Sequence, residues 1–390
     1  MGCCSKKKET EINVDLLDVI SDDQNNIKKV KEDYNLSEKM TKEDFSTIKV
    51  LGQGSFGKVL LVRMRSNNKL YAMKMLDKSF LKAKKQEEHT KTERDLMVKL
   101  NSPFILNIKF AFQDSTNVYI ITEFMQGGDL FFHLHSNRKF KEEQAKFYMI
   151  EIILAIEELH KNNMVYRDLK PENILMDQFG HLKISDFGLS KIIHKMTDKA
   201  YTLCGTPQYV APEILYKKGY EKGIDWWSFG CVAYEMLTGK LPYEIPVGPK
   251  LSLEMFKPKV EFPEGINKDL KDLIEKLLTK EPKKRLGYGT DDAKAVKNHP
   301  YFKDVDWDLY LNKKVDPPFV PDLEDDEDLK YFDKYFTNES VSNINKHEAE
   351  SNKDSKTPMN IKGFTYISDS MRNNDTKQPN DNYITNTNYL

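Results

Sequence analysis

Apolar residues recur with two different spacings along the chain, and these spacings predict where strands and helices lie. Apolar positions alternate from residue 45 onward, on both sides of a glycine-rich segment, which indicates a pair of strands. Further strand-like runs lie at 118–124, 174–176 and 181–184. Helical spacing is found at 87–100 and 140–160, and helices separated by Pro and Gly are predicted from 224 to 302. The pattern therefore predicts a mixture of strands and helices between residues 45 and 302.

Both ends of the chain are polar and lack this patterning. Residues 9–43 are mostly charged, with one weak apolar cluster that predicts a short helix inside a linker. In the tail after residue 302, the proline-rich stretch 317–321 is expected to lie extended on the domain. Residues 371–390 are rich in Asn, and we expect them to be disordered because they offer few apolar side chains to bury.

Composition excludes several classes of protein. The net charge of −1 over 390 residues argues against a nucleic-acid-binding role. Four cysteines, two of them adjacent at the start, form no disulfide framework, so we expect a reducing compartment. No apolar run approaches the roughly eighteen residues of a membrane-spanning helix, and no apolar segment typical of a secretory signal follows the start.

The densest group of reactive side chains lies between Tyr166 and Gly188. Asp168, Lys170 and Asn173 fall within six residues, and Asp186 follows eighteen residues after the first acid. The two short strands between them predict a hairpin that brings both acids to one site. Phosphoryl transfer needs one carboxylate to orient a hydroxyl, and a second with an amide oxygen to hold Mg²⁺. The alternative interpretation is a polar loop and a glycine turn without chemistry.

A second motif, Gly-x-Gly-x-x-Gly at residues 52–57, occurs in two unrelated nucleotide-binding folds. In a dinucleotide-binding fold it leads into a helix. Here Val59 and the apolar residues after it continue as a strand. The hairpin form favours a flap whose glycines let backbone N–H groups approach the phosphates of ATP.

Together these motifs resemble the eukaryotic protein kinases over about residues 45–370. Tyr-Arg-Asp at 166–168, in place of His-Arg-Asp, is similar to the AGC group, and Asp-Leu-Lys-Pro-Glu-Asn at 168–173 resembles serine/threonine kinases. The resemblance implies an α+β, bilobal fold with a small β-rich N-lobe, a larger helical C-lobe and a C-terminal tail that wraps the N-lobe. The expected regions are an N-terminal segment and linker (1–44), a kinase domain (45–302), an AGC tail (303–370) and a disordered end (371–390).

The resemblance also implies the roles of the motif residues in a reaction that uses ATP and Mg²⁺. Asp168 is the expected catalytic base, Lys170 would neutralise the transferring phosphate, and Asn173 and Asp186 would hold the metal. The alternative is a pseudokinase scaffold that uses the fold for binding only. Such a scaffold usually lacks one of these residues or Lys74, and all are present.

The ATP site is expected to centre on Lys74, which would grip the α- and β-phosphates while paired with Glu93. Outside this ordered set, the two residues could form only a surface ion pair. Thr122 falls at the gatekeeper position between the lobes. The full set of expected ATP contacts is Leu51, Gly52, Gly54, Ser55, Phe56, Gly57, Lys58, Val59, Ala72, Lys74, Glu93, Thr122, Glu123, Met125 and Asp129.

Residues 201–213 resemble the activation segment of the family. Thr202 matches the activating phosphosite, which implies an upstream activating kinase and a pairing of the phosphate with Arg167, Lys191 and His89. Thr206 matches the residue that braces the catalytic base. Glu213 is expected to pair with an arginine as a structural ion pair. A kinase of small molecules or lipids would not need this peptide-positioning segment.

The tail resembles that of protein kinase B and the ribosomal-protein kinases. Residues 328–337 resemble the element that crosses the ATP site. Ile361-Lys-Gly-Phe364-Thr365-Tyr366 matches the hydrophobic motif, except that Ile361 replaces the usual first Phe. Thr365 is the expected phosphosite of this motif, and its phosphate would dock the motif beside the helix that carries Glu93.

Three acids match positions at which the family reads basic substrates. Asp129, Glu172 and Glu235 are expected to recognise Arg or Lys upstream of the phosphorylated Ser or Thr, because carboxylate–guanidinium pairs are strong and directional. The partners are therefore protein substrates with upstream basic residues. The alternative is that these acids only line a solvated groove.

The first eight residues resemble an acylation site. Gly2 could be myristoylated and Cys3 and Cys4 palmitoylated, which would place the protein in the cytoplasm on the cytoplasmic face of a membrane. Ser5 stands one place earlier than the hydroxyl residue of the usual myristoylation motif, and Lys6 occupies that place. The alternative is an unmodified start with two solvent-facing thiols.

Overall fold

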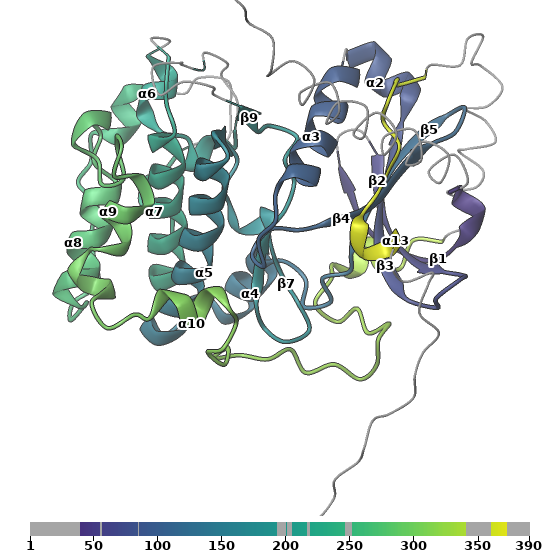
Figure 1. The fold of residues 1–390 in the computed structure, drawn as a ribbon. Helices are drawn as coiled ribbons and strands as arrows, with labels where there is room; N and C mark the ends of the chain where they lie inside the picture. Colours follow the sequence, from purple (N-terminus) through teal and green to yellow (C-terminus); the bar gives the residue numbers. More distant parts are fainter. Residues whose placement is uncertain are drawn as a thin grey trace, which may run out of the picture.

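The computed structural model describes residues 40–54, 57–84, 86–192, 200, 205–216, 219–245, 252–340 and 360–372. They form a lobe built around one sheet and a larger helical lobe, joined by the segment after β5 (Figure 1). This is the α+β, bilobal arrangement that the motifs predict. Among the described residues, none of the helices has the length and apolar character that a bilayer crossing requires.

The small lobe is a six-stranded antiparallel sheet in the order β1-β2-β3-β5-β4-β10. Its strands are β1 (Phe45–Gly54), β2 (Gly57–Met64), β3 (Leu70–Asp77), β4 (Ile108–Gln113), β5 (Asn117–Glu123) and β10 (Tyr366–Ile367). Two helices follow β3, namely α2 (Lys78–Lys84) and α3 (Glu87–Lys99). One face of the sheet buries a cluster of aromatic rings, in which Phe45 stacks on Phe112 and packs edge-on against Tyr71. The other face belongs to the core that continues into the large lobe.

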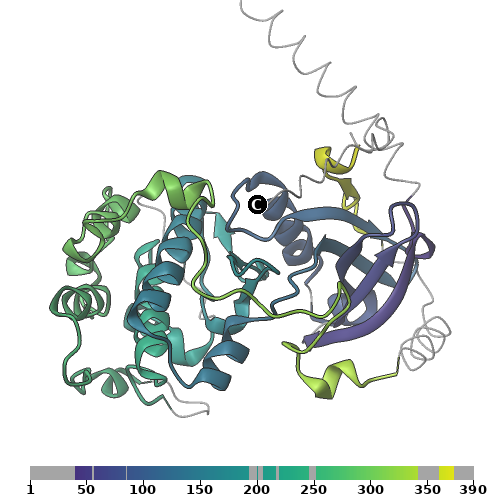
Figure 2. The ribbon, with the colours of Figure 1, turned by 90° about the horizontal axis from the view of Figure 1, so that it is seen from below.

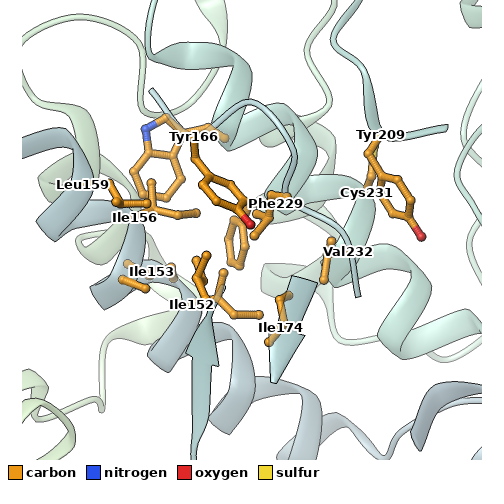
Figure 3. Packing of buried hydrophobic residues seen from close by; sticks show 14 of the residues in the cluster. Ile152, Ile153, Ile156, Leu159, Tyr166, Ile174, Tyr209, Phe229, Cys231 and Val232 are labelled. Atoms are coloured by element: carbon orange, nitrogen blue, oxygen red, sulfur yellow. The ribbon is translucent and has the colours of Figure 1, made fainter. Parts of the chain in front are cut away.

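The large lobe is organised around two buried helices, α5 (Glu142–Lys161) and α7 (Gly223–Thr238). Isoleucines of α5 and apolar residues of α7 pack around Tyr166 and Ile174, so both ends of the loop between these two residues are anchored in the buried core (Figure 3). The other helices are α4 (Leu130–Asn137), α6 (Pro212–Leu215), α8 (Lys268–Leu277), α9 (Asp292–Lys297) and α10 (Trp307–Leu311). The large-lobe strands are β6 (Met164–Val165), β7 (Ile174–Met176), β8 (Leu182–Ile184) and β9 (Lys191–Ile192).

The predicted hairpin is present, with β7 and β8 paired antiparallel from Ile174↔Ile184 to Met176↔Leu182. The predicted helices and strands shift only at their ends. The helix expected over 140–160 is α5, which starts at Glu142 after the N-cap Lys141. The strand expected over 118–124 is β5, which ends at Glu123. Glu123 pairs with Tyr71, which is the second residue of β3 after Leu70.

The tail returns from the large lobe to the small lobe across the side of the molecule (Figure 2). In the small lobe α11 (Lys334–Thr337) contacts β1, and β10 adds the edge strand beside β4. The short helix α13 (Asp369–Arg372) follows and places Met371 against the aromatic cluster. The expectation of disorder from residue 371 is therefore wrong for 371–372, because this one apolar side chain has a surface to bury. Residues 373–390 lie outside the described residues.

Candidate active site

The loop that carries Asp168 is held in place from below by Asp225 of α7. The Asp225 carboxylate is fully buried and accepts hydrogen bonds from Tyr166 N (2.8 Å) and Arg167 N (2.9 Å). Arg167 has φ +74°, a left-handed conformation that costs free energy in any residue with a side chain. The backbone bonds to Asp225 therefore stabilise a strained turn that presents the next residue, Asp168.

The Asp168 carboxylate lies at the centre of a hydrogen-bond network. Its Oδ1 accepts from Thr206 N (3.1 Å) and Thr206 Oγ1 (2.9 Å). Its Oδ2 accepts from Asn173 Nδ2 (2.9 Å) and lies 3.1 Å from Lys170 Nζ. Lys170 Nζ also donates to Thr206 Oγ1 at 2.8 Å. The structure thus brings together all four residues expected here and fixes the orientation of the carboxylate from both sides.

A second set of charges links the small lobe to Asp186. Lys74 Nζ lies 2.6 Å from Glu93 Oε1 and 3.3 Å from Asp186 Oδ1. Asp186 has φ +51° and also accepts from Gly188 N at 3.3 Å. Lys74 lowers the pKa of Asp186, which keeps this carboxylate ionised at neutral pH, whereas the two acids raise the pKa of Lys74. The expected Lys74–Glu93 pair is therefore present, with Asp186 as a third member.

The strands β2, β3 and β5 place the other expected ATP contacts on one face. Val59 pairs with Lys74, and Ala72 pairs with Thr122. Residues that pair directly in an antiparallel sheet share a face, as do residues two apart along a strand. Val59, Ala72 and Lys74 are half-buried, so this face is partly accessible to solvent. Leu51 and Thr122 are buried.

Two residues of the glycine-rich segment make contacts within the protein, and their expected contacts with ATP remain predictions. A Cβ at Gly57 would lie 1.8 Å from Met75 O, so this glycine is needed for β2 to approach β3. Gly52 and Gly54 have open space around them, which fits the expected approach to phosphates. The Lys58 side chain forms an ion pair with Glu339 of the tail. Ser55 and Phe56 lie outside the described residues.

Around the linker between the lobes, the expected adenine contacts also have structural tasks. Met125 O accepts a hydrogen bond from Gly128 N (3.1 Å), so a contact of Met125 with adenine would use its N–H. The Glu123 side chain turns to the large lobe, where it pairs with Lys183 (2.7 Å) and accepts from Asn107 N (3.1 Å). Only the backbone of Glu123 is then available for the expected role.

The tail lies against this linker. Phe332 stacks on Phe124 with ring centroids 5.8 Å apart, and Gln126 Nε2 donates to Asp325 O at 2.6 Å. A Cβ at Gly128 would lie 2.3 Å from Tyr331 O, so the tail packs directly on the backbone. The expected crossing of residues 328–337 at the ATP site therefore has a physical basis in stacking and close backbone approach.

Three acids form a negative region beside the catalytic loop. Asp129 caps α4 by accepting from Phe132 N (2.7 Å), and burial, with the charge of Glu172 in addition, raises its pKa to about 6. Burial raises the pKa of Glu235, with a further contribution from Glu172, and Glu235 accepts from Tyr209 OH at 2.7 Å. The charge of the exposed Glu172 thus contributes to the raised pKa of both other acids.

The anchor of the activation segment is an ion pair inside the large lobe. Arg285 donates to both oxygens of Glu213, with Nη2 2.8 Å from Oε2, and its side chain is fully buried. Arg167 Nη1 donates to Tyr220 OH at 3.2 Å. Thr202 lies outside the described residues, as do Gly2, Cys3 and Cys4.

The hydrophobic motif is docked on the small lobe. Phe364 is fully buried with the Arg94 guanidinium 5.6 Å from its ring centre, and Arg94 also donates to Gly363 O. Ile361 is buried, and its backbone N–H and C=O both bond the Gln113 side chain. Thr365 is half-buried between Phe364 and the start of β10. Ile361 thus occupies a buried position, although its side chain is smaller than the usual Phe.

The fold and this constellation of charges define a protein kinase. Residues 45–302 match the family model of the protein kinase domain, and residues 323–366 match that of the protein kinase C terminal domain. The chain belongs to the protein kinase family and, with this tail, to its AGC group.

The chain is similar to several serine/threonine kinases. It is 39% identical to a RAC family serine/threonine-protein kinase homolog of Dictyostelium discoideum, over 76% of this chain and 66% of the relative. It is 42% identical to serine/threonine-protein kinase SCH9 of Candida albicans, over 76% of this chain and 38% of the relative. It is 42% identical to a ribosomal protein S6 kinase beta of Caenorhabditis elegans, over 66% of this chain and 47% of the relative. The chain thus spans less than two thirds of the length of these relatives.

Proposed function

We propose that the protein is a serine/threonine protein kinase that transfers the γ-phosphate of ATP to protein substrates. The single observation that carries this proposal is the hydrogen-bonded set of Asp168, Lys170, Asn173 and Thr206, together with the Lys74–Glu93–Asp186 group. A scaffold that only binds ligands would have no need of a carboxylate oriented on both oxygens beside a lysine.

In the proposed reaction the hydroxyl of the substrate attacks the γ-phosphorus while the bond to the bridging oxygen of ADP breaks. Asp168 orients this hydroxyl and takes its proton, because its carboxylate is held by Thr206 and Asn173. Lys170 Nζ, which already bonds Thr206 Oγ1, supplies positive charge next to the transferring phosphate. Lys74 binds the other phosphates and is held in position by Glu93.

The residues expected to hold Mg²⁺ fit that ion chemically. The amide N–H group of Asn173 donates hydrogen bonds to Asp168, so the amide oxygen of Asn173 is the atom that can face a cation. Asp186 is an ionised carboxylate because Lys74 lowers its pKa. Carboxylate and amide oxygens, with phosphates and water, are the ligands that Mg²⁺ prefers. When bound, Mg²⁺ neutralises the charge on the phosphate oxygens.

Substrates with Arg or Lys upstream of the acceptor fit the acids beside the loop. The charge of Glu172 acts on both Asp129 and Glu235, and burial of these two acids strengthens pairing with a guanidinium. A peptide that binds there would place its acceptor near Asp168.

Control by two phosphates, added by an upstream kinase and acting in signal transduction, is part of the proposal. A phosphate on Thr202 would pair with Arg167, whose guanidinium lies at the edge of the activation segment on Tyr220. A phosphate on Thr365 would strengthen the docking of the motif next to Arg94 and α3. The proposal also retains attachment of the cytoplasmic protein to a membrane through lipids on Gly2, Cys3 and Cys4.

The test is Asp168→Asn in a peptide-phosphorylation assay. Loss of a positioned base typically costs on the order of 10²–10⁴-fold in kcat, while nucleotide binding should persist because Lys74 and Asp186 are unchanged. The matched control is Asp308→Asn, an exposed acid on α10. A wild-type protein that binds ATP without phosphorylating any peptide of an arrayed library, or an Asp168→Asn variant with the parent rate, would contradict the proposal and favour a binding scaffold.

A further inference from the structure

A buried histidine lies between two carboxylates beneath the catalytic loop. His160, near the end of α5, has a side chain that is only 1% exposed. Its Nε2 lies 2.9 Å from Asp225 Oδ2, and its Nδ1 lies 2.8 and 3.0 Å from the two oxygens of Asp292. Asp225 belongs to α7 and Asp292 begins α9, so one imidazole joins three helices.

The geometry requires this imidazole to be charged. A carboxylate only accepts hydrogen bonds, so both ring nitrogens must carry a proton to bond both acids. Burial lowers the pKa of His160, but the two carboxylates outweigh it and raise the pKa to about 9. Among the described residues, the other charged group at this junction is Lys222, whose Nζ donates to His160 O and lowers the pKa of Asp292. An imidazolium is thus balanced by Asp225 on one side and Asp292 on the other.

Asp292 is held for this contact at a conformational cost. Its φ of +40° is unfavourable for a residue with a side chain. Besides His160, its carboxylate accepts from Trp226 Nε1 at 2.7 Å, and the ring of this tryptophan packs edge-on against the imidazole with centroids 5.5 Å apart. Such strain persists where surrounding contacts enforce it, and both contacts of Asp292 lead to the same imidazole.

Asp225 connects His160 to the backbone of the catalytic loop. The same Oδ2 that faces His160 accepts from Tyr166 N, while Oδ1 accepts from Arg167 N in its strained conformation. If His160 became neutral, Asp225 would be a fully buried carboxylate without an opposite charge, which is a large penalty. Movement of Asp225 would then release the backbone that presents Asp168.

We propose that Asp292 is a positioning residue for phosphoryl transfer, because it keeps His160 in the imidazolium form that holds Asp225 and the Arg167–Asp168 backbone in place. The inference rests on the proposed kinase function. Asp292 touches neither ATP nor peptide, so its effect appears in kcat and in the pH profile, and not in the KM for ATP.

The test is Asp292→Asn, which keeps shape and removes the charge. Its amide can donate to a neutral Nδ1, so the variant permits a neutral imidazole whose pKa falls towards or below the ordinary value of about 6.5. From about pH 6 to about pH 8, we expect kcat of the variant to fall about tenfold, a loss of about 1.4 kcal/mol in transition-state stabilisation, while wild type shows no such limb. Asp292→Glu, which restores the charge, should recover most of the activity at the higher pH.

Asp272→Asn is the matched control. Asp272 also pairs with a buried histidine of the large lobe, His299 Nε2 at 2.9 Å, but this pair makes no bond to the catalytic loop. Its removal should leave the pH profile of kcat unchanged. A limb of the same size in Asp272→Asn would overturn the proposal, because loss of any histidine–carboxylate pair would then suffice.

A spectroscopic readout separates this proposal from the kinase function itself. Long-range ¹H–¹⁵N spectra of full-length wild type should show two protonated ring nitrogens for His160 at about pH 8, and one in Asp292→Asn. A neutral wild-type imidazole at about pH 7, or a parent-like pH profile of the variant, would overturn the role of Asp292. If the nitrogens behave as expected but wild type phosphorylates no peptide, the kinase function fails and the charge assignment of His160 stands.

Discussion

Truncation of Phe364 to alanine should undock the end of the tail without unfolding the domain. The Phe364 ring is fully buried, and removing a buried Phe typically costs about 3–5 kcal/mol. The Arg94 guanidinium over the ring adds about 0.5–2 kcal/mol that is also lost. These contacts connect residues 360–372 to the small lobe, so the loss should appear as local opening of this segment.

Native-state hydrogen exchange of full-length protein measures this opening directly. The amides of the β10–β4 ladder and Ser368 N, which donates to Lys109 O (2.9 Å), report on the docked tail. A loss of about 3 kcal/mol corresponds to more than a hundredfold faster exchange wherever opening of this segment limits it. Kinase activity should fall with it, because α3 carries both Arg94 and Glu93, the partner of Lys74.

Tyr335→Ala is the control, since this aromatic ring of the same tail is 80% exposed and should leave both readouts unchanged. The reasoning would be refuted if Phe364→Ala left the exchange of Tyr366, Ile367 and Ser368 at parent rates. It would also be refuted if the amides of the whole small lobe lost protection together, because the segment would then not be a separate docking unit.

Four further predictions concern the ion pair, the acids, the activation segment and the first residues. Glu213→Ala should lower the free energy of unfolding by about 3–5 kcal/mol, because it leaves the buried Arg285 charge unpaired; the exposed Glu281→Ala should cost at most about 1 kcal/mol in the same urea titration. As pH falls through about 6, Asp129 takes up a proton and loses its charge, so the KM for peptides with upstream Arg should rise in wild type but stay flat in Asp129→Asn; an equal rise in both would count against Asp129. Thr202→Ala should abolish the activation produced by an upstream kinase, and a variant that is activated as fully as wild type would exclude this phosphosite. Wild type should sediment with membranes and Gly2→Ala should stay soluble, because the roughly 10⁴ M⁻¹ of one myristoyl chain needs a second anchor; a pelleting Gly2→Ala protein would refute acylation there.

The sequence predicted the structural features that depend on residues close together along the chain. The β7–β8 hairpin follows from two short apolar runs around a glycine turn, and α3 and α5 follow from helical spacing. The grouping of Asp168 with Lys170 and Asn173 needed only their closeness along the chain.

Motifs of the family predicted some contacts between distant segments, such as that of Glu213 with Arg285, but other distant contacts could not be predicted. The sequence did not predict that the Lys58 side chain pairs with Glu339, nor that Gly57 is required by Met75 of the neighbouring strand. The expected contacts of both residues with ATP remain predictions. The two contacts within the protein depend on which residue of another segment arrives opposite, and no periodicity carries that information. The same holds for the ion pair of Glu123 with Lys183. These residues lie 60 positions apart and come together only when the two lobes pack.

The strand β10 completes the sheet of the small lobe. The residues around it contact parts of the chain far upstream, and one example is the hydrogen bond from Arg94 to Gly363, which lie 269 positions apart. During synthesis on the ribosome, β4 therefore emerges long before its last partner exists. Until the tail arrives, the outer edge of β4 exposes unpaired backbone groups and the pocket of Phe364 is empty, a combination that favours non-native strand pairing. The nascent chain should therefore need chaperones until the tail has been synthesised, and not only until the kinase domain is complete. Truncation before residue 360 should increase aggregation during translation.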